Sequence, residues 1–97
     1  MMLKIPHTKE LEKVAQRLIW FKSPQDALED PYTFMAHVMT YGTLNDVLII
    51  KKALGMVAFK EALDHLPPGI IDAKSWNYWN LMVGRFPVPP LPERKIH

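Results

Sequence analysis

The stretch GTLNDVLIIKKALG, residues 42–55, begins and ends with glycine and places a helix between the two. Thr43 is a suitable N-cap, because its hydroxyl can accept a hydrogen bond from the backbone N–H of Asp46, three residues further on. Gly42 is expected to stop the preceding helix in the left-handed conformation that glycine adopts without strain, and Gly55 to stop this one. The stretch therefore predicts consecutive helices with very short connections.

The rest of the chain carries similar helix starts and stops. Thr8, Ser23 and Asp72 are expected N-caps, and Asp30-Pro31 opens a helix in the same way as Ser23-Pro24. No strand pattern competes with these signals. The expected elements are helices at 9–21, 31–41, 44–54, 56–66 and 73–83, with a short helical turn at 24–29. The sequence thus predicts an all-α fold, a compact bundle of about five short helices.

Apolar residues recur at helical spacing and indicate the core. One face of the last helix carries Trp76, Trp79, Met82 and Val83, with Asn77 and Asn80 opposite. The two tryptophans are expected to form the main apolar plug of the core, the alternative being a stacking platform for a ligand. In the first helix the apolar face includes Phe21, whereas Trp20 points to the polar side. The remaining apolar positions of these faces are Leu11, Val14, Ala15 and Leu18 in the first helix, and Met56, Phe59, Ala62, Leu63 and Leu66 in the fifth.

The helix at 44–54 is less regular, because Ile49 stands alone opposite a wide apolar sector that also contains Lys51. Two interpretations stay open. The helix is either central and contacted on two sides, with the Lys51 stem passing the core, or it offers Ile49 to another chain.

Composition limits the functional classes. The 97 residues suit one domain with a modest core, which a partner could complete. The absence of cysteine excludes disulfides and thiolate zinc sites, and a net charge of +2 does not by itself indicate nucleic-acid binding. The apolar run Val47–Ile50 is far shorter than the ~20 residues of a membrane-spanning helix. The N-terminus lacks the features of a signal peptide, so we expect a cytoplasmic protein that does not span a membrane.

Known catalytic motifs are missing from the sequence. The four histidines are scattered, and Glu61 with His65 is expected to form a solvated contact across one helical turn. The acidic residues at 26–30 suit helix starts better than acid–base chemistry. We therefore expect no enzyme, and no catalytic, cofactor-binding or metal-binding residue.

The helices at 31–41 and 44–54 resemble a helix-turn-helix, which makes a DNA-binding regulator the alternative hypothesis. Asn45, Lys51 and Lys52 would then contact DNA. The outer face of 44–54 offers few of the Arg, Gln or Ser side chains that read bases, so nucleic-acid binding is not favoured.

The chain divides into an N-terminal extension at 1–7, a helical domain at 8–84 and a C-terminal arm at 85–97. The amino-acid composition changes abruptly at the start of the arm. Prolines occupy four of the positions 87–92, which favours an extended polyproline II arm. The arm contains the pattern Pro89-x-x-Pro92-x-Arg94, typical of segments that dock in aromatic grooves. It either packs over its own domain, with Phe86 as anchor, or extends across a partner.

Several short motifs resemble a family of small helical bacterial proteins commonly encoded next to nucleotidyltransferase-like toxins of the AbiEii class. The resemblance spans about residues 20–86 and rests on Gly42-Thr43-x-x-Asp46, Leu54-Gly55, Pro67-Pro68-Gly69-Ile70 and Ser75-Trp76-x-Tyr78-Trp79. It implies a compact helical antitoxin or accessory partner of such a toxin and carries over no catalytic residue. The chain is too short to hold both the winged-helix domain and the larger C-terminal domain of related bicistronic antitoxins, so direct protein binding is the simpler expectation.

The leading hypothesis is therefore a non-enzymatic protein-binding module whose partner is the neighbouring toxin, with a second copy of the chain as another partner. Apolar anchors and a basic arm would form the contact surface. The residues expected to bind the partner are Trp20, Ile49, Arg85, Phe86, Pro89, Pro92 and Arg94.

Overall fold

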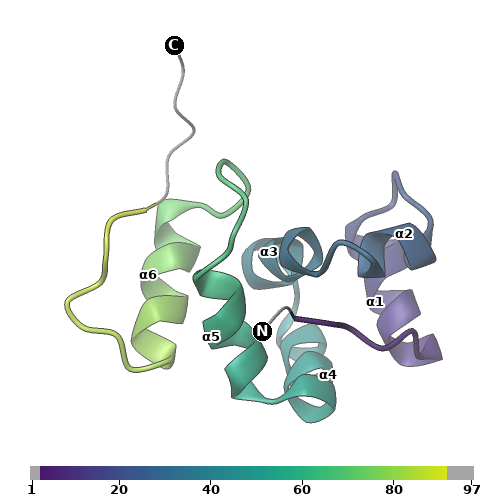
Figure 1. The fold of residues 1–97 in the computed structure, drawn as a ribbon, viewed down its shortest axis with the longest axis horizontal. Helices are drawn as coiled ribbons and strands as arrows, with labels where there is room; N and C mark the ends of the chain where they lie inside the picture. The colour runs from purple at the N-terminus through teal and green to yellow at the C-terminus, as the bar shows by residue number, and fades with distance from the viewer. Residues whose placement is uncertain (1–2, 92–97) are drawn as a thin grey trace.

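The computed structural model describes residues 3–91, and this range contains six helices and no strand (Figure 1). The predicted all-α class is confirmed. The count is six rather than about five, because the residues expected to form only a turn make a helix of their own, α2. The helices are α1 (Lys9–Leu18), α2 (Pro24–Leu28), α3 (Pro31–Tyr41), α4 (Leu44–Leu54), α5 (Met56–Leu63) and α6 (Ala73–Met82).

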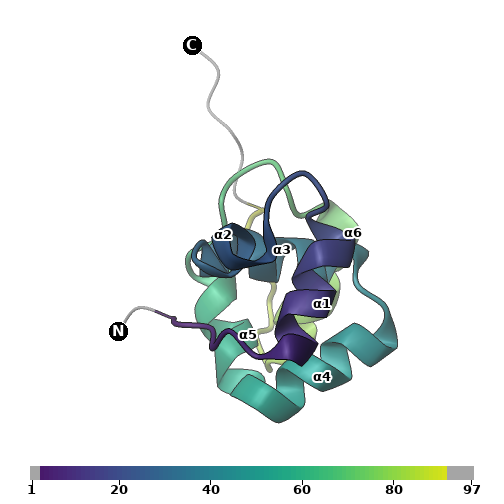
Figure 2. The same cartoon turned by 90° about the vertical axis from the view of Figure 1, so that its right-hand side faces the viewer.

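Helix α3 occupies the centre of the molecule and contacts each of the other five helices. The α1–α2 pair lies at one end of the long axis, and α5 and α6 lie side by side at the other (Figure 1). Figure 2 shows α1 in front of α3, with α4 below α1 and in contact with it. The side chains of α3 that fill this central position are Phe34, Met35, Ala36, Val38 and Met39, all buried.

Side-chain caps begin four of the helices, as the sequence predicts. Thr8, Ser23, Thr43 and Asp72 each accept a hydrogen bond from the backbone N–H three residues later, at distances between 2.8 and 3.2 Å. Asp30 is the exception, because its side chain makes no capping bond and Pro31 alone marks the start of α3. The expectation that Asp30-Pro31 works like Ser23-Pro24 was thus wrong for the side chain.

Gly42 does not have the left-handed conformation that we expected. Its φ of −69° and ψ of 153° are open to any residue, whereas Gly55 has the positive φ of 80° that was predicted. Space explains Gly42 instead: a Cβ there would lie 2.5 Å from the carbonyl oxygen of Val38. Glycine lets the chain turn tightly past the last turn of α3.

Trp76 and Trp79 are buried, as predicted, and Trp79 closes the core between α3, α5 and α6. Its ring stacks on Phe59 with 4.6 Å between centroids, and its indole N–H donates to the carbonyl of Met39 at 2.9 Å.

Three neighbouring predictions were wrong. Phe21 is exposed, because α1 already ends at Leu18, and Met82 is exposed at the end of α6. Asn80 is buried, and its amide donates to the carbonyl of Trp76 at 2.9 Å. This bond to the preceding turn accounts for the amide nitrogen, whereas the buried Oδ1 has no hydrogen-bond partner within residues 3–91.

Residues on either side of 8–84 pack against the core. Ile5 is buried, and Leu3, Val88 and Leu91 are partly buried against the core cluster. The carbonyl of Pro89 accepts a 2.7 Å hydrogen bond from the indole N–H of Trp76. Residues 85–91 therefore pack over their own domain, which was one of the two interpretations of the proline-rich segment. Phe86 is 84% exposed, so it is not the anchor of this contact.

None of the helices in residues 3–91 has the length and apolar character needed to cross a membrane.

Candidate functional site

Two hollows lie on different sides of helix α4, and different residues of this helix line each of them. Leu44 and Val47 face the first hollow, while Asn45 and Ile49 face the second. Between these stripes, Asp46 and Ile50 point into the molecule and are buried. Helix α4 thus serves as a shared wall of two surfaces with different chemistry.

The first hollow, here called the apolar groove, has a volume of about 350 Å³ and runs between the α3–α4 corner and α6. Leu44 and Tyr78, which line it, are 75% and 54% exposed. Lys74 and Ser75 supply the polar side chains at one edge. The apolar residues that line the groove are Val38, Met39, Leu44, Val47, Tyr78 and Trp79.

The second hollow, here called the basic groove, has a volume of about 470 Å³ and lies between α1 and α4. Its α1 wall presents the exposed side chains of Lys9, Lys13 and Arg17. Ile49 is half-buried and packs against the core. This position favours the interpretation that α4 is contacted on two sides over the interpretation that Ile49 is offered to another chain. The full lining is Lys9, Glu10, Lys13, Val14, Arg17, Asn45 and Ile49.

An ion pair joins the two walls of the basic groove. Arg17 binds the fully buried Asp46 through two nitrogens, with Nη1 at 2.9 Å from Oδ2 and Nη2 on Oδ1. Oδ2 also accepts a 2.9 Å hydrogen bond from the backbone N–H of Thr43, which completes a capping box. The Arg17 guanidinium, followed by the Thr43 hydrogen bonds, lowers the pKa of Asp46 despite its burial, so the carboxylate stays ionised.

Exposed aromatic side chains form a row beyond the C-terminal end of α1. Trp20 is 80% exposed, and its ring meets that of Phe21 edge-on with centroids 5.7 Å apart. The row continues through His37, 6.2 Å from Phe21, to Tyr41, 6.1 Å from His37. The Nδ1 atom of His37 lies 2.8 Å from the carbonyl of Thr33 in its own helix, which holds the ring in place.

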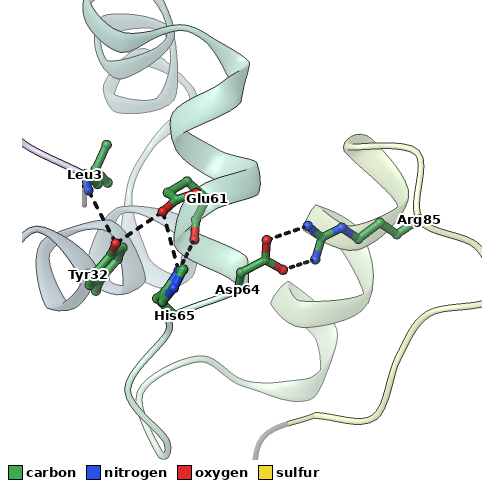
Figure 3. A network of polar contacts seen from close by, with 6 residues as sticks. All are labelled: Leu3, Tyr32, Glu61, Asp64, His65 and Arg85. Carbon is green, nitrogen blue, oxygen red and sulfur yellow. Dashed lines mark hydrogen bonds and ion pairs between the residues drawn. The ribbon is translucent and has the colours of Figure 1, made fainter. Parts of the chain in front are cut away.

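A polar network at the α5 end joins segments that are distant in sequence (Figure 3). Tyr32 accepts a hydrogen bond from the backbone N–H of Leu3 at 3.3 Å and donates to Glu61 at 3.4 Å. The ring of His65 stacks on Tyr32 with centroids 4.9 Å apart, and its Nδ1 lies 3.7 Å from Glu61 Oε1. His65 and Glu61 thus meet as predicted, and they tie the N-terminal segment to α3 and α5.

Arg85 contributes to the same region through a bidentate ion pair with Asp64 at 2.7 and 3.1 Å (Figure 3). The Arg85 guanidinium lowers the pKa of Asp64 by hydrogen bonding. This pair and the Trp76–Pro89 bond hold residues 85–89 on the domain. Within residues 3–91, no group of three histidine or acidic side chains is placed to hold a metal ion.

The structure does not bring the predicted partner-binding residues together. Trp20 belongs to the α1–α2 connection, whereas Arg85, Phe86 and Pro89 lie beside α6 at the opposite end of the molecule (Figure 1). Ile49 lines a groove of its own. Pro92 and Arg94 lie outside the described residues.

The residues of the alternative DNA-binding hypothesis, Asn45, Lys51 and Lys52, are all exposed on α4. The exposed side chains nearest the N-terminal end of α4 are Leu44, Asn45 and Leu48. Apolar side chains therefore stand where a base-reading helix would carry polar ones.

Sequence reasoning missed Phe21, Tyr41, Leu44 and Tyr78 as surface residues. Phe21 and Tyr41 sit at or just beyond the ends of helices, where the helical period no longer indicates a direction. Leu44 begins α4 and Tyr78 lies inside α6, and for both the position of the neighbouring helix decides whether they are covered. The position of Leu44 directly after the N-cap was the one local sign of an uncovered first turn.

No protein-family model matches the chain, and no curated protein sequence or solved structure matches it either. The resemblance to the small partners of nucleotidyltransferase-like toxins therefore stays a prediction.

Proposed function

We propose that this chain is a non-enzymatic protein-binding module and that its partner docks in the apolar groove. The observation that carries the proposal is the concentration of exposed apolar side chains around a concave surface. Leu44 and Tyr78 line this hollow and are both more than half exposed. Tyr41 and Leu48, which are also exposed, adjoin the lining residues Gly42 and Val47 in sequence. Exposed apolar surface gathered in one place and rimmed by polar residues is typical of interaction sites.

The groove also has the composition of a protein interface. The exposed Leu44 and the partly buried Val47 supply apolar area that a partner can cover, over the buried Val38 and Trp79. Tyr78 offers an exposed aromatic side chain with a hydroxyl. Tyrosine and tryptophan are enriched among residues that dominate binding energy, especially near the middle of an interface. Lys74 and Ser75 at the edge can fix the orientation of the partner.

The first partner to test is the nucleotidyltransferase-like toxin that the family resemblance suggests. We expect the product of the adjacent reading frame to co-purify with this chain and to lose its toxicity when both are expressed. A chain that stays monomeric and does not relieve the toxicity would contradict this choice of partner.

Two substitutions test the groove. Leu44→Asp and Tyr78→Asp place a carboxylate where apolar contact is expected, and both side chains are exposed enough to change without loss of folding. We expect each to weaken binding at least about tenfold in calorimetric titration, as for a residue at the centre of an interface.

Val57→Asp is the matched control, because Val57 is equally exposed but lies on α5 outside the groove. A partner that binds Leu44→Asp and Val57→Asp with the same affinity as the unchanged protein would show that the apolar groove is not the site.

A further inference from the structure

We propose that the basic groove binds a segment of single-stranded nucleic acid, with a base stacked on Trp20. This site lies on the other side of α4 from the apolar groove, and the proposal does not depend on the proposed function. It rests on three observations: the row of cations on α1, the neutralised acid between the walls, and the exposed aromatic pair at one end.

The cations of the groove follow one line. Lys9, Lys13 and Arg17 recur every four residues on α1, about 6 Å apart along the helix axis. On the facing helix, Asn45 and Ile49 line the groove, and Lys52 continues their stripe one turn further. A chain with regularly spaced negative charges could contact these cations in succession.

The acidic groups do not cancel this charge. Asp46 is buried and already paired with Arg17, so the pair is neutral as a unit. Glu10 is the one further acid among the lining residues, while Glu12 turns away and accepts a 2.8 Å hydrogen bond from Gln25. Among the lining residues, Lys9 and Lys13 against Glu10 leave an excess of one positive charge, and Lys52 on the next turn of α4 raises it to two.

Arg17 can contact a ligand without leaving Asp46. Its side chain is 52% exposed. A guanidinium has five N–H donors, and the Asp46 carboxylate uses one on Nη1 and one on Nη2, which leaves three for a ligand. The ion pair therefore holds the arginine at the lip of the groove in a fixed orientation.

The aromatic pair of Trp20 and Phe21 follows Arg17 by three and four residues, just past Leu18, the last residue of α1. Exposed aromatic rings near a row of cations form the combination that binds single strands, because every base has a face that can stack. A concave groove suits a strand lying in it, whereas reading duplex DNA needs a helix that projects outward. An acidic protein segment would match the charge, but lysine is depleted in protein interfaces.

Fluorescence anisotropy with labelled oligothymidylate of about ten nucleotides tests the proposal at about 50 mM salt. We expect affinity to fall with salt at a logarithmic slope of about −2, which corresponds to about three phosphate contacts. Binding should also quench tryptophan emission, because Trp20 is exposed while Trp76 and Trp79 are buried.

Variants separate the two kinds of contact. Lys13→Gln should lower affinity about fivefold at about 0.1 M salt and reduce the slope by about 0.7, since one phosphate contact is lost. Trp20→Ala should lower affinity about tenfold with an unchanged slope and abolish the quenching. Lys60→Gln, on α5, is the charge-matched control and should leave both readouts unchanged.

Three results would overturn the proposal. The first is no binding at low salt, and the second is tighter binding of a duplex of equal length. The third is displacement of the oligonucleotide by polyglutamate at equal charge concentration, which would assign the groove to an acidic protein segment. The Leu44→Asp and Tyr78→Asp variants should bind the oligonucleotide normally, so that a failure here is distinct from a failure of the apolar groove.

Discussion

Asp46 combines three roles in one buried side chain. It caps α4 through Thr43, it pairs with Arg17 of α1, and it fills a position between the two grooves. The capping role is predictable from the spacing of Thr43 and Asp46, because it depends on local geometry alone. The pairing with Arg17, 29 residues away, is not predictable, since the sequence does not show which of the chain's twelve lysines and arginines approaches Asp46.

Asp46→Asn should destabilise the protein in a pH-dependent way. The folded state lowers the pKa of Asp46, so the ion pair stabilises the fold above the ordinary pKa of ~3.9 and this stabilisation is lost as the pH falls through the lowered value. We expect the free energy of unfolding to drop by about 2 kcal/mol at neutral pH, because the hydrogen bonds of a charged group are weakened and the Arg17 side chain is half exposed. Urea titrations should show the difference from the unchanged protein shrinking below about pH 4.

The more exposed Asp64, paired with Arg85, provides the comparison. Asp64→Asn should cost less than about 1 kcal/mol, because water already screens that pair. An equal loss for both variants would mean that burial does not strengthen the Arg17–Asp46 pair.

At the scale of elements, the chain is organised by its helix ends. The four side-chain caps and the positive φ of Gly55 were predicted correctly, because each depends on a few neighbouring residues. The reason for glycine at position 42 was predicted wrongly, because the obstacle to a side chain there is the Val38 carbonyl of the preceding helix and not the backbone conformation. The sequence pattern thus predicted that α3 ends at Gly42, but it did not predict why glycine is needed at this position.

Gly42→Ala tests this explanation by the sign of its effect. The backbone angles of Gly42 suit alanine, so conformational entropy alone predicts a gain of about 0.5 kcal/mol. The 2.5 Å approach of a Cβ to the Val38 oxygen predicts a loss instead, of about 1–3 kcal/mol. Thermal unfolding distinguishes the two.

Gly84→Ala serves as the contrasting case, because its φ of 82° is strained for alanine but nothing lies near the added Cβ. It should lose about 1 kcal/mol from conformation alone. A gain in stability for Gly42→Ala would show that the last turn of α3 relaxes freely.

The segment after α6 should loosen when its hydrogen bond to Trp76 is removed. Trp76→Phe keeps an aromatic ring but cannot donate to the Pro89 carbonyl. We expect faster backbone motion of Val88 and Leu91 in ¹⁵N relaxation, with a loss of about 1 kcal/mol in stability. Tyr78→Phe, on the exposed side of the same helix, should change neither.

At the scale of the whole molecule, α3 forms the centre and the two ends of the described chain close over the core. The sequence predicted which residues are apolar enough for the core, as Phe59, Trp76 and Trp79 show. It predicted that Trp20 lies on the polar side of the first helix, and Trp20 is exposed. It did not predict that Leu44 and Phe21 stay exposed, because they follow the same periodicity as buried residues. Only the placement of α1, α4 and α6 around α3 decides that, and with it the position of both grooves.

Ile5→Ala should destabilise the protein although Ile5 precedes the first helix. The side chain is buried in the core cluster, so its truncation leaves a cavity worth about 2–3 kcal/mol. Chemical denaturation measures the loss. Lys4→Ala, exposed and adjacent, should stay within about 0.5 kcal/mol of the unchanged protein.

The bond from the Trp79 indole to the Met39 carbonyl spans 40 residues and has a consequence for synthesis on the ribosome. Translation proceeds from the N-terminus, so the central helix emerges long before the residue that covers its C-terminal end and stacks on Phe59. A nascent chain that stops before α6 exposes Phe59 and the apolar end of α3. The folded state therefore becomes available late in translation, and incomplete chains present the surface that proteases and chaperones recognise.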